Sequence, residues 1–168
     1  MSSETITTAL FLITAVVAAG VLINAVYPVI YTMAGTFSSS THESDVRIRT
    51  DFKIIATYGS YSTSTAQIWM KNTGTERISL DDIKKADVFC GGEGNFDHLT
   101  YSTSTGDKKW QVDFGPEYDL NGNGYWDPGE TVKITAETST MPASGGNVYF
   151  QFTLSNGIWR SIEFTTVS

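Results

Sequence analysis

The chain has 168 residues, a net charge of −7 and a single cysteine. This acidic balance excludes a protein that binds nucleic acid through a basic surface, and equally one that adheres to anionic lipid through clustered lysines and arginines. The lone Cys90 excludes an internal disulfide, and we expect its thiol to be buried in the core.

The first predicted element is an apolar helix that spans a membrane. The run from Ile6 to Ile30 contains no Asp, Glu, Lys, Arg or His. A helix of that length reaches about 37 Å, enough to cross the hydrocarbon of a bilayer. No basic residue precedes the run, and it is longer than the apolar part of a signal peptide, so we expect it to be retained. We expect the helix unit to cover residues 1–36 and to end near Gly35.

Small and polar residues within this run predict that the helix associates with other helices. Ala15 and Ala19 form a small-xxx-small step, which allows two helix backbones to approach closely in lipid. Gly20 and Asn24 lie on a neighbouring stripe, where the Asn24 amide can hydrogen-bond across a helix contact. Pro28 removes one backbone hydrogen bond, so a kink or loosening is expected there. The alternative is a lone tilted anchor.

A polar hinge at residues 37–45 is expected to lead into a β-domain at residues 46–168. From Val46 to Ile54 apolar and polar residues alternate, which is typical of a half-buried strand. Ser79 begins a capping box and predicts one short helix, and Asn156-Gly157 predicts a tight hairpin. Further strands are predicted at 66–71, 88–90, 99–102, 110–114, 131–136, 148–154 and 158–164.

These elements predict an α+β fold. It consists of a long N-terminal transmembrane α-helix followed by an antiparallel β-sandwich, because many short strands joined by close turns are typical of sandwiches. The tryptophans could line a sugar-binding surface, but in a sandwich of this size we expect them to fill the core.

The strongest local motif predicts a calcium site. The segment from Asp119 to Glu130 matches D-x-[DN]-x-[DN]-G-x5-E at every required position. Calcium takes about six to eight oxygen ligands, and a loop of this pattern wraps around the ion. Because strands rather than helices are expected on both sides, we predict a structural ion on a hairpin; the alternative is an Asx- and Gly-rich turn. The predicted ligands are Asp119, Asn121, Asn123, the backbone carbonyl of Tyr125, Asp127 and Glu130.

No catalytic site is predicted. His42 and His98 are expected in the hinge and near a strand end, and the sequence has no nucleophile, nucleotide-binding or zinc motif. We therefore expect a protein that is not an enzyme.

An apolar N-terminal helix joined to a β-sandwich resembles type IV pilin-like and archaellin-like subunits. The segment from Ile68 to Gly74 (IWMKNTG) is similar to a strand-and-turn motif of archaellin sandwiches. The segments 3–13, 18–24 and 27–31 resemble the FlaG and FlaF family of archaellum accessory proteins, and FlaG more closely.

This resemblance implies a structural protein of the archaellum, the rotary swimming filament of archaea. It implies self-assembly through the helices and a FlaF-like partner that contacts the surface-layer protein, which together anchor the static part of the motor. The protein would be membrane-anchored with its sandwich in the pseudoperiplasm. No short basic leader precedes the helix, so archaellin-type processing is not expected. An archaellin filament subunit and a monomeric membrane-anchored surface binding module remain the alternatives.

Overall fold

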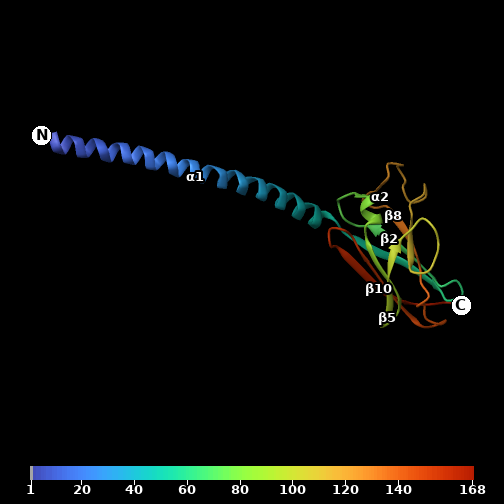
Figure 1. Ribbon diagram of the computed structural model, residues 1–168. Helices are drawn as coiled ribbons and strands as arrows, with labels where there is room; N and C mark the ends of the chain where they lie inside the picture. Colours follow the sequence, from blue (N-terminus) through green and yellow to red (C-terminus); the bar gives the residue numbers. More distant parts are fainter. Residues whose placement is uncertain (1) are drawn as a thin grey trace. The chain divides into compact units, whose positions relative to one another are not determined.

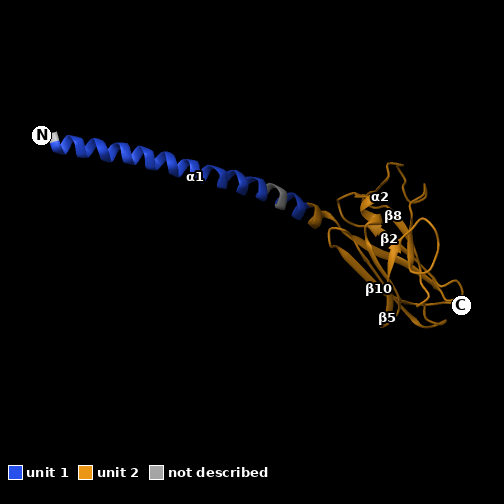
Figure 2. Cartoon of the chain, viewed as in Figure 1, with its two compact units in different colours: residues 1–45 blue, residues 46–168 orange. Residues whose placement is uncertain are grey.

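The computed structural model describes residues 2–168, apart from the side chains of Ser2 and of residues 38–40. Met1, which the predicted helix unit includes, lies outside the described residues. The chain divides into two compact units, residues 1–45 and 46–168, which Figure 2 shows in different colours.

Helix α1 runs without interruption from Ser2 to Arg49 (Figure 1). The predicted long apolar helix is thus confirmed. Of the helices that the structure describes, it alone is long and apolar enough to cross a membrane. None of its most apolar stretch is buried, so large side chains such as Phe11 and Tyr31 are exposed. An apolar surface of this extent needs lipid or other protein around it.

The helix is longer than predicted, because the expected hinge at residues 37–45 is helical. The serines and threonines of this stretch indicate a loop, yet the Thr41 hydroxyl donates to the Phe37 carbonyl at 2.7 Å. A hydroxyl bonded in this way turns back onto the helix backbone and does not compete with the helix.

The strand predicted from Val46 is also wrong in its first half. Residues 46–49 form the last turn of α1, and Ile48 is 83% exposed instead of facing a core. The helix ends at Arg49, and the backbone N–H and hydroxyl of the next residue, Thr50, both donate to the Val46 carbonyl, at 3.0 and 2.7 Å. Alternation of apolar residues over so short a stretch fits a helix end as well as a strand.

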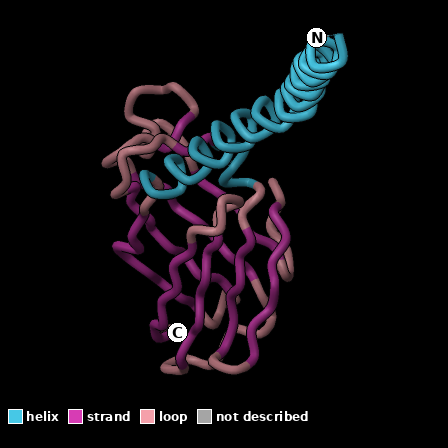
Figure 3. Tube along the Cα trace, turned by 90° about the vertical axis from the view of Figure 1, so that its left-hand side faces the viewer, coloured by secondary structure: helices cyan, strands magenta, loops and turns pink. Residues whose placement is uncertain are grey.

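The unit 46–168 is a sandwich built from one rolled sheet, whose strands Figure 3 shows lying alongside one another. The strand order is β1-β2-β8-β6-β5-β4-β9-β10, and β3 pairs separately with β7. The strands are β1 (Phe52–Ser60), β2 (Thr65–Asn72), β3 (Ile78–Ser79), β4 (Asp87–Gly92), β5 (Asn95–Tyr101), β6 (Lys109–Asp113), β7 (Tyr125–Trp126), β8 (Thr131–Glu137), β9 (Asn147–Thr153) and β10 (Trp159–Thr165).

The sheet is mostly antiparallel, as predicted. Among the described strands, the exception is the β5–β6 pair, which is parallel. Strands β1, β2, β8 and β6 make one layer of the sandwich, and β5, β4, β9 and β10 make the other. Helix α2 (Leu80–Lys84) confirms the predicted capping box, because the Ser79 hydroxyl accepts the Asp82 N–H at 3.1 Å. The Asn156-Gly157 turn joins β9 to β10 as a hairpin, also as predicted.

The core lies between the two layers. Phe52 from the first layer packs edge-on against Phe152 from the second, with ring centroids 5.6 Å apart. Cys90 is buried there as expected, and burial raises the pKa of its thiol to about 12. The tryptophans fill the core only in part: Trp110 and Trp126 are buried, whereas Trp159 is 53% exposed.

Candidate functional site

Helix α1 carries the predicted assembly residues. Ala15, Ala19, Gly20, Asn24 and Pro28 are all exposed, and α1 continues through Pro28. The Asn24 amide donates to the Gly20 carbonyl at 3.2 Å, so it is bonded within its own helix. A Cβ at Gly20 would meet no atom within 4 Å, so this surface is open. Association through these residues stays a prediction.

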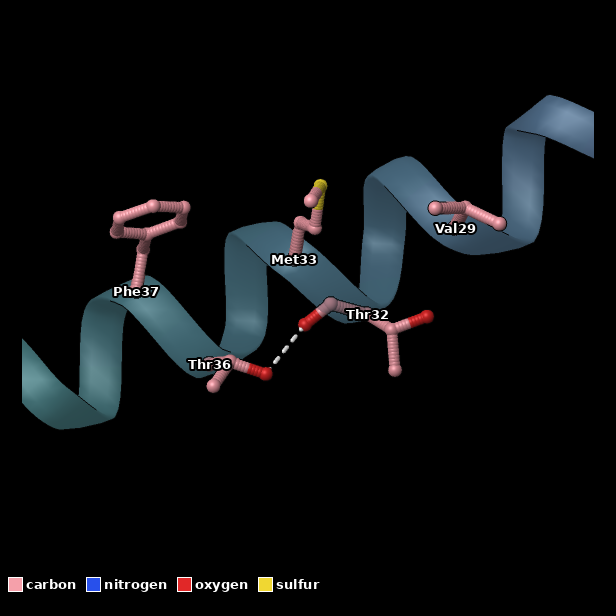
Figure 4. A pocket seen from close by; sticks show the side chains of 5 residues that line it. All are labelled: Val29, Thr32, Met33, Thr36 and Phe37. Carbon is pink, nitrogen blue, oxygen red and sulfur yellow. Dashed lines mark hydrogen bonds between the residues drawn. The ribbon is translucent and has the colours of Figure 1, made fainter.

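A shallow groove follows one side of α1 further along. Figure 4 shows its lining residues, Val29, Thr32, Met33, Thr36 and Phe37. The Thr36 hydroxyl donates to the Thr32 carbonyl at 2.8 Å, so its polar group is satisfied within the helix. One helix cannot enclose a ligand, and this groove therefore suits a neighbouring helix or lipid chains.

The junction between α1 and β1 is held by a turn at residues 73–76. The Arg49 carbonyl accepts two backbone N–H bonds from this turn, at 2.9 and 3.2 Å, and the Asp51 carbonyl accepts two more, at 3.0 and 2.9 Å. A helix leaves its last carbonyls without partners, and the turn supplies donors to the last of them, that of Arg49. The Arg49 guanidinium also lies 3.4 Å from the Glu76 carboxylate.

Two residues of the IWMKNTG segment shape this turn. Asn72 is 1% exposed, and its amide donates to the carbonyls of Trp126 and Glu76 at 2.8 and 2.9 Å. Its oxygen accepts the Gly74 N–H at 3.0 Å. Gly74 is needed because a Cβ there would lie 2.3 Å from the Arg49 carbonyl oxygen. Sequence reasoning noted the segment but missed this role; the signal was an Asn and a Gly at the end of an apolar strand.

The same Asn72 connects the junction to the predicted calcium loop. The Glu130 carbonyl accepts the Asn72 N–H and the Trp126 indole N–H, both at 2.9 Å. The Gly129 N–H donates to the Asn72 carbonyl at 2.9 Å. One end of the loop is thus fixed to the sandwich beside the helix end. The loop is not the simple hairpin that was expected, because β7 lies within it and pairs with β3.

The predicted calcium ligands lie in this loop, where the carboxylates accept hydrogen bonds from the loop's own backbone. The Asp119 carboxylate accepts three backbone N–H bonds from residues 122–124 at 2.8, 3.2 and 2.9 Å. The Glu130 carboxylate, 6% exposed, accepts the N–H groups of Leu120 and Asp127 at 3.0 and 2.9 Å. Gly124 has φ +76°, as the tight turn of such a loop requires. The Asp119 and Glu130 carboxylates thus hold the loop in a compact turn, and calcium binding there stays a prediction.

The amide ligands are turned differently. Asn121 and Asn123 each donate an amide N–H to the Asp127 carboxylate at 2.7 Å, and these bonds, Asn121 first, lower the pKa of Asp127. Their oxygens accept backbone N–H groups of the loop. A cation at the centre requires both amides to rotate and present oxygen. Within residues 2–168, as described, no three His, Cys, Asp or Glu side chains gather closely enough to hold a metal alone.

Comparison with known proteins adds a family and a fold. A family model for archaeal-type flagellin matches residues 2–164. An uncharacterized protein of Archaeoglobus fulgidus is 30% identical over 170 residues, which cover 98% of this chain and 99% of that protein.

Three solved structures are similar. The archaellum periplasmic stator protein FlaG of Sulfolobus acidocaldarius has a TM-score of 0.54 at 23% identity, over 68% of this chain and 99% of that chain. The complex of FlaF and FlaG from the same organism has a TM-score of 0.53 at 22% identity, over 67% of this chain and 87% of that chain. The archaeal flagellum of Methanospirillum hungatei strain JF1 has a TM-score of 0.56 at 18% identity, over 92% of this chain and 91% of that chain. Because α1 has 48 residues, a match over 92% of the chain includes most of this helix.

Proposed function

The chain belongs to the archaeal-type flagellin family, and from this premise we propose that it is a stator-type protein that anchors the base of the archaellum. The family makes the chain a structural component of the archaellum and not an enzyme. The sequence-based resemblance to FlaG and archaellins is thereby confirmed.

The fold match to FlaG carries the stator proposal. It covers 99% of that protein and has the highest sequence identity of the three solved structures reported above. A stator also has to be fixed in the cell envelope, and the exposed apolar surface of α1 supplies the anchor. In this proposal the N-terminus lies at the cytoplasmic side and the sandwich lies in the pseudoperiplasm. The turn 73–76 then holds the end of α1 at Arg49, where the chain enters the domain.

The partners in this proposal are further copies of the chain, a FlaF-like protein and the surface-layer protein. Support comes from the solved complex of FlaF and FlaG and from the filament of M. hungatei. Self-association would use α1, through the step formed by Ala15 and Ala19.

A filament subunit is the second candidate function. It is favoured by the match to the M. hungatei filament, which extends into α1. Filament subunits bury their helices against one another along the axis, and an apolar helix exposed on all sides suits that environment as well as lipid.

Shearing of cells separates the two functions. An antibody against the sandwich is used to measure the protein in sheared filaments and in the remaining envelopes, with the cells' major archaellin and an integral membrane protein as markers. We expect the protein to stay with the envelopes. A signal that follows the major archaellin into the filaments would contradict the stator proposal and support the filament subunit.

We also propose that the loop from Asp119 to Glu130 binds calcium in a structural role. The hydrogen bonds from backbone N–H groups of the loop to the Asp119 and Glu130 carboxylates support it, as does the positive φ of Gly124. The ion would stiffen the segment that Asn72 connects to the end of α1.

A further inference from the structure

The outer side of strands β5, β4, β9 and β10 carries a cluster of partly or fully exposed rings, here called the ring face. Phe89 stacks on His98 with centroids 4.8 Å apart, and Phe96 lies 5.0 Å from Tyr149. Gly91 pairs with Phe96 on one side and Tyr149 on the other, so the missing side chain allows the two rings to meet across the strand. Phe96 is 48% exposed. Rings that point away from the core contribute nothing to core packing.

The ring face is acidic. Asp87 and Glu163 are exposed on the same side of the sheet. Asp87 pairs with Thr153 of β9 and Glu163 pairs with Tyr149 of β9. The imidazole of His98 lies 3.0 Å from the Asp87 carboxylate. Trp159, 53% exposed, extends the apolar surface along the outer side of β10.

The outer side of β1, β2, β8 and β6, here called the lysine face, has the opposite character. Lys53 and Lys71 are exposed and stand directly opposite each other across the β1–β2 ladder. Across the described part of the chain, neither forms an ion pair. Like charges directly opposite each other destabilise a sheet unless something neutralises them. Trp69 and Tyr58 lie on the same side, so the lysine face also offers ring surface.

We propose that the ring face of one copy of this chain docks on the lysine face of the next. One carboxylate of the ring face, Asp87 or Glu163, then faces the Lys53–Lys71 pair, and the partly exposed rings meet Trp69. Because the two surfaces differ, the contact is heterologous and repeats from copy to copy, as a row or ring of subunits requires. The charge complementarity of two faces of one chain selects a second copy as the occupant. This inference rests on the proposed assembling function and names the surface that it uses.

Zero-length carbodiimide cross-linking tests the contact directly. Full-length protein in neutral phosphatidylcholine vesicles is prepared as a mixture of 14N- and 15N-labelled copies, and cross-linked peptides are identified by mass spectrometry. We expect mixed-label links that join Lys53 or Lys71 to Asp87 or Glu163. Mixed-label links that consistently avoid these four residues would overturn the proposal.

Charge reversal gives a second test that does not depend on one variant folding well. K53E/K71E alone and D87K/E163K alone should each lower the yield of linked oligomers at least about tenfold, because like charges then face each other. Mixing the two variants pairs each reversed face with a complementary one, so the yield should return. If the mixture gives no higher yield of linked oligomers than either variant alone, the proposal is overturned. K84E/K85E makes the same charge change away from both faces, at Lys84 and the exposed Lys85, which pair with Asp81 and Asp82, and it is the control for net charge.

Separate results distinguish this inference from the proposed function. Oligomers linked through α1, together with a yield unchanged by the face reversals, would leave the assembling function intact and reject the docking contact. If the face reversals leave the yield of linked oligomers unchanged and the ring face binds soluble sugar, the docking contact is rejected and the ring face is a carbohydrate-binding surface. A protein that stays monomeric throughout would reject both.

Discussion

A Cβ on Gly74 would lie 2.3 Å from the carbonyl oxygen of Arg49 and 2.5 Å from the backbone nitrogen of Asp51. The turn 73–76 and the end of α1 therefore fit together backbone to backbone, at a separation that no side chain can enter. The fit places four backbone N–H groups within hydrogen-bonding reach of the Arg49 and Asp51 carbonyls. The end of α1 at Arg49 is thereby held to the turn 73–76 by hydrogen bonds in addition to the continuous chain.

Replacement of Gly74 by Ala should loosen this junction. The added methyl group forces the turn away from the helix end, and we expect a loss of about 2–4 kcal/mol in the free energy of unfolding. Thermal unfolding in detergent, followed by the fluorescence of the buried tryptophans, measures it. Gly94→Ala is the control, because nothing lies within 4 Å of its Cβ position and only its positive φ costs stability, about 1 kcal/mol. Equal losses would contradict the backbone-to-backbone fit.

Asp97 should make stability depend on pH in the acid range. Its carboxylate accepts hydrogen bonds from Lys108 and Thr138, both at 2.8 Å, and these, Lys108 first, lower the pKa of Asp97. A folded pKa below the unfolded value, about 3.9, means that the contribution is present above the unfolded value and is lost as pH falls through the folded one.

Asp97→Asn should therefore reduce the change of unfolding free energy with pH below about pH 4. Denaturant titrations from pH 7 to pH 2 measure this slope. A variant with the slope of the natural protein would show that Asp97 is not coupled to folding.

Ala19→Leu should weaken association of α1. Ala19 is one end of the small-xxx-small step that begins at Ala15, and a leucine there holds two helix backbones apart. Ala18→Leu makes the same change on a neighbouring face and is the matched control. Energy transfer between labelled subunits in vesicles, as a function of protein density, measures association. If both variants associate equally well, the step formed by Ala15 and Ala19 is not the contact.

Calcium should raise the melting temperature more than magnesium does. An ion bound only by the folded protein stabilises it by about 2.7 kcal/mol when the free ion is about 100-fold above Kd. Asp127→Asn removes one predicted ligand and should reduce the gain, whereas Glu117→Gln, just before the loop, should not. Equal stabilisation by magnesium would remove the proposed site.

The parts of the fold that depend on neighbouring residues were predictable. Apolar composition predicted α1, the Ser79 capping box predicted α2, and Asn156-Gly157 predicted the last hairpin. The family resemblance was visible in the helix and in the IWMKNTG segment. Each of these signals is local, and the residues that produce it interact within a few positions.

The rest depends on partners far along the chain. The extension of α1 to Arg49 is held by donors from the turn 73–76, which no local pattern near Arg49 reveals. The loop from Asp119 to Glu130 differs from a hairpin because Trp126 is buried and carries β7 onto β3. The ring face depends on Gly91 and on the register of three strands, which decide that Phe96 and Tyr149 meet.

The hydrogen bond from Asn24 to the Gly20 carbonyl has a consequence for a single subunit that has not yet associated with others. A polar side chain in lipid is costly when it has no partner, and here the helix provides one itself. In the proposed assembly, a subunit inserted in the bilayer therefore needs no neighbouring helix to satisfy Asn24, and single chains can persist there until they associate.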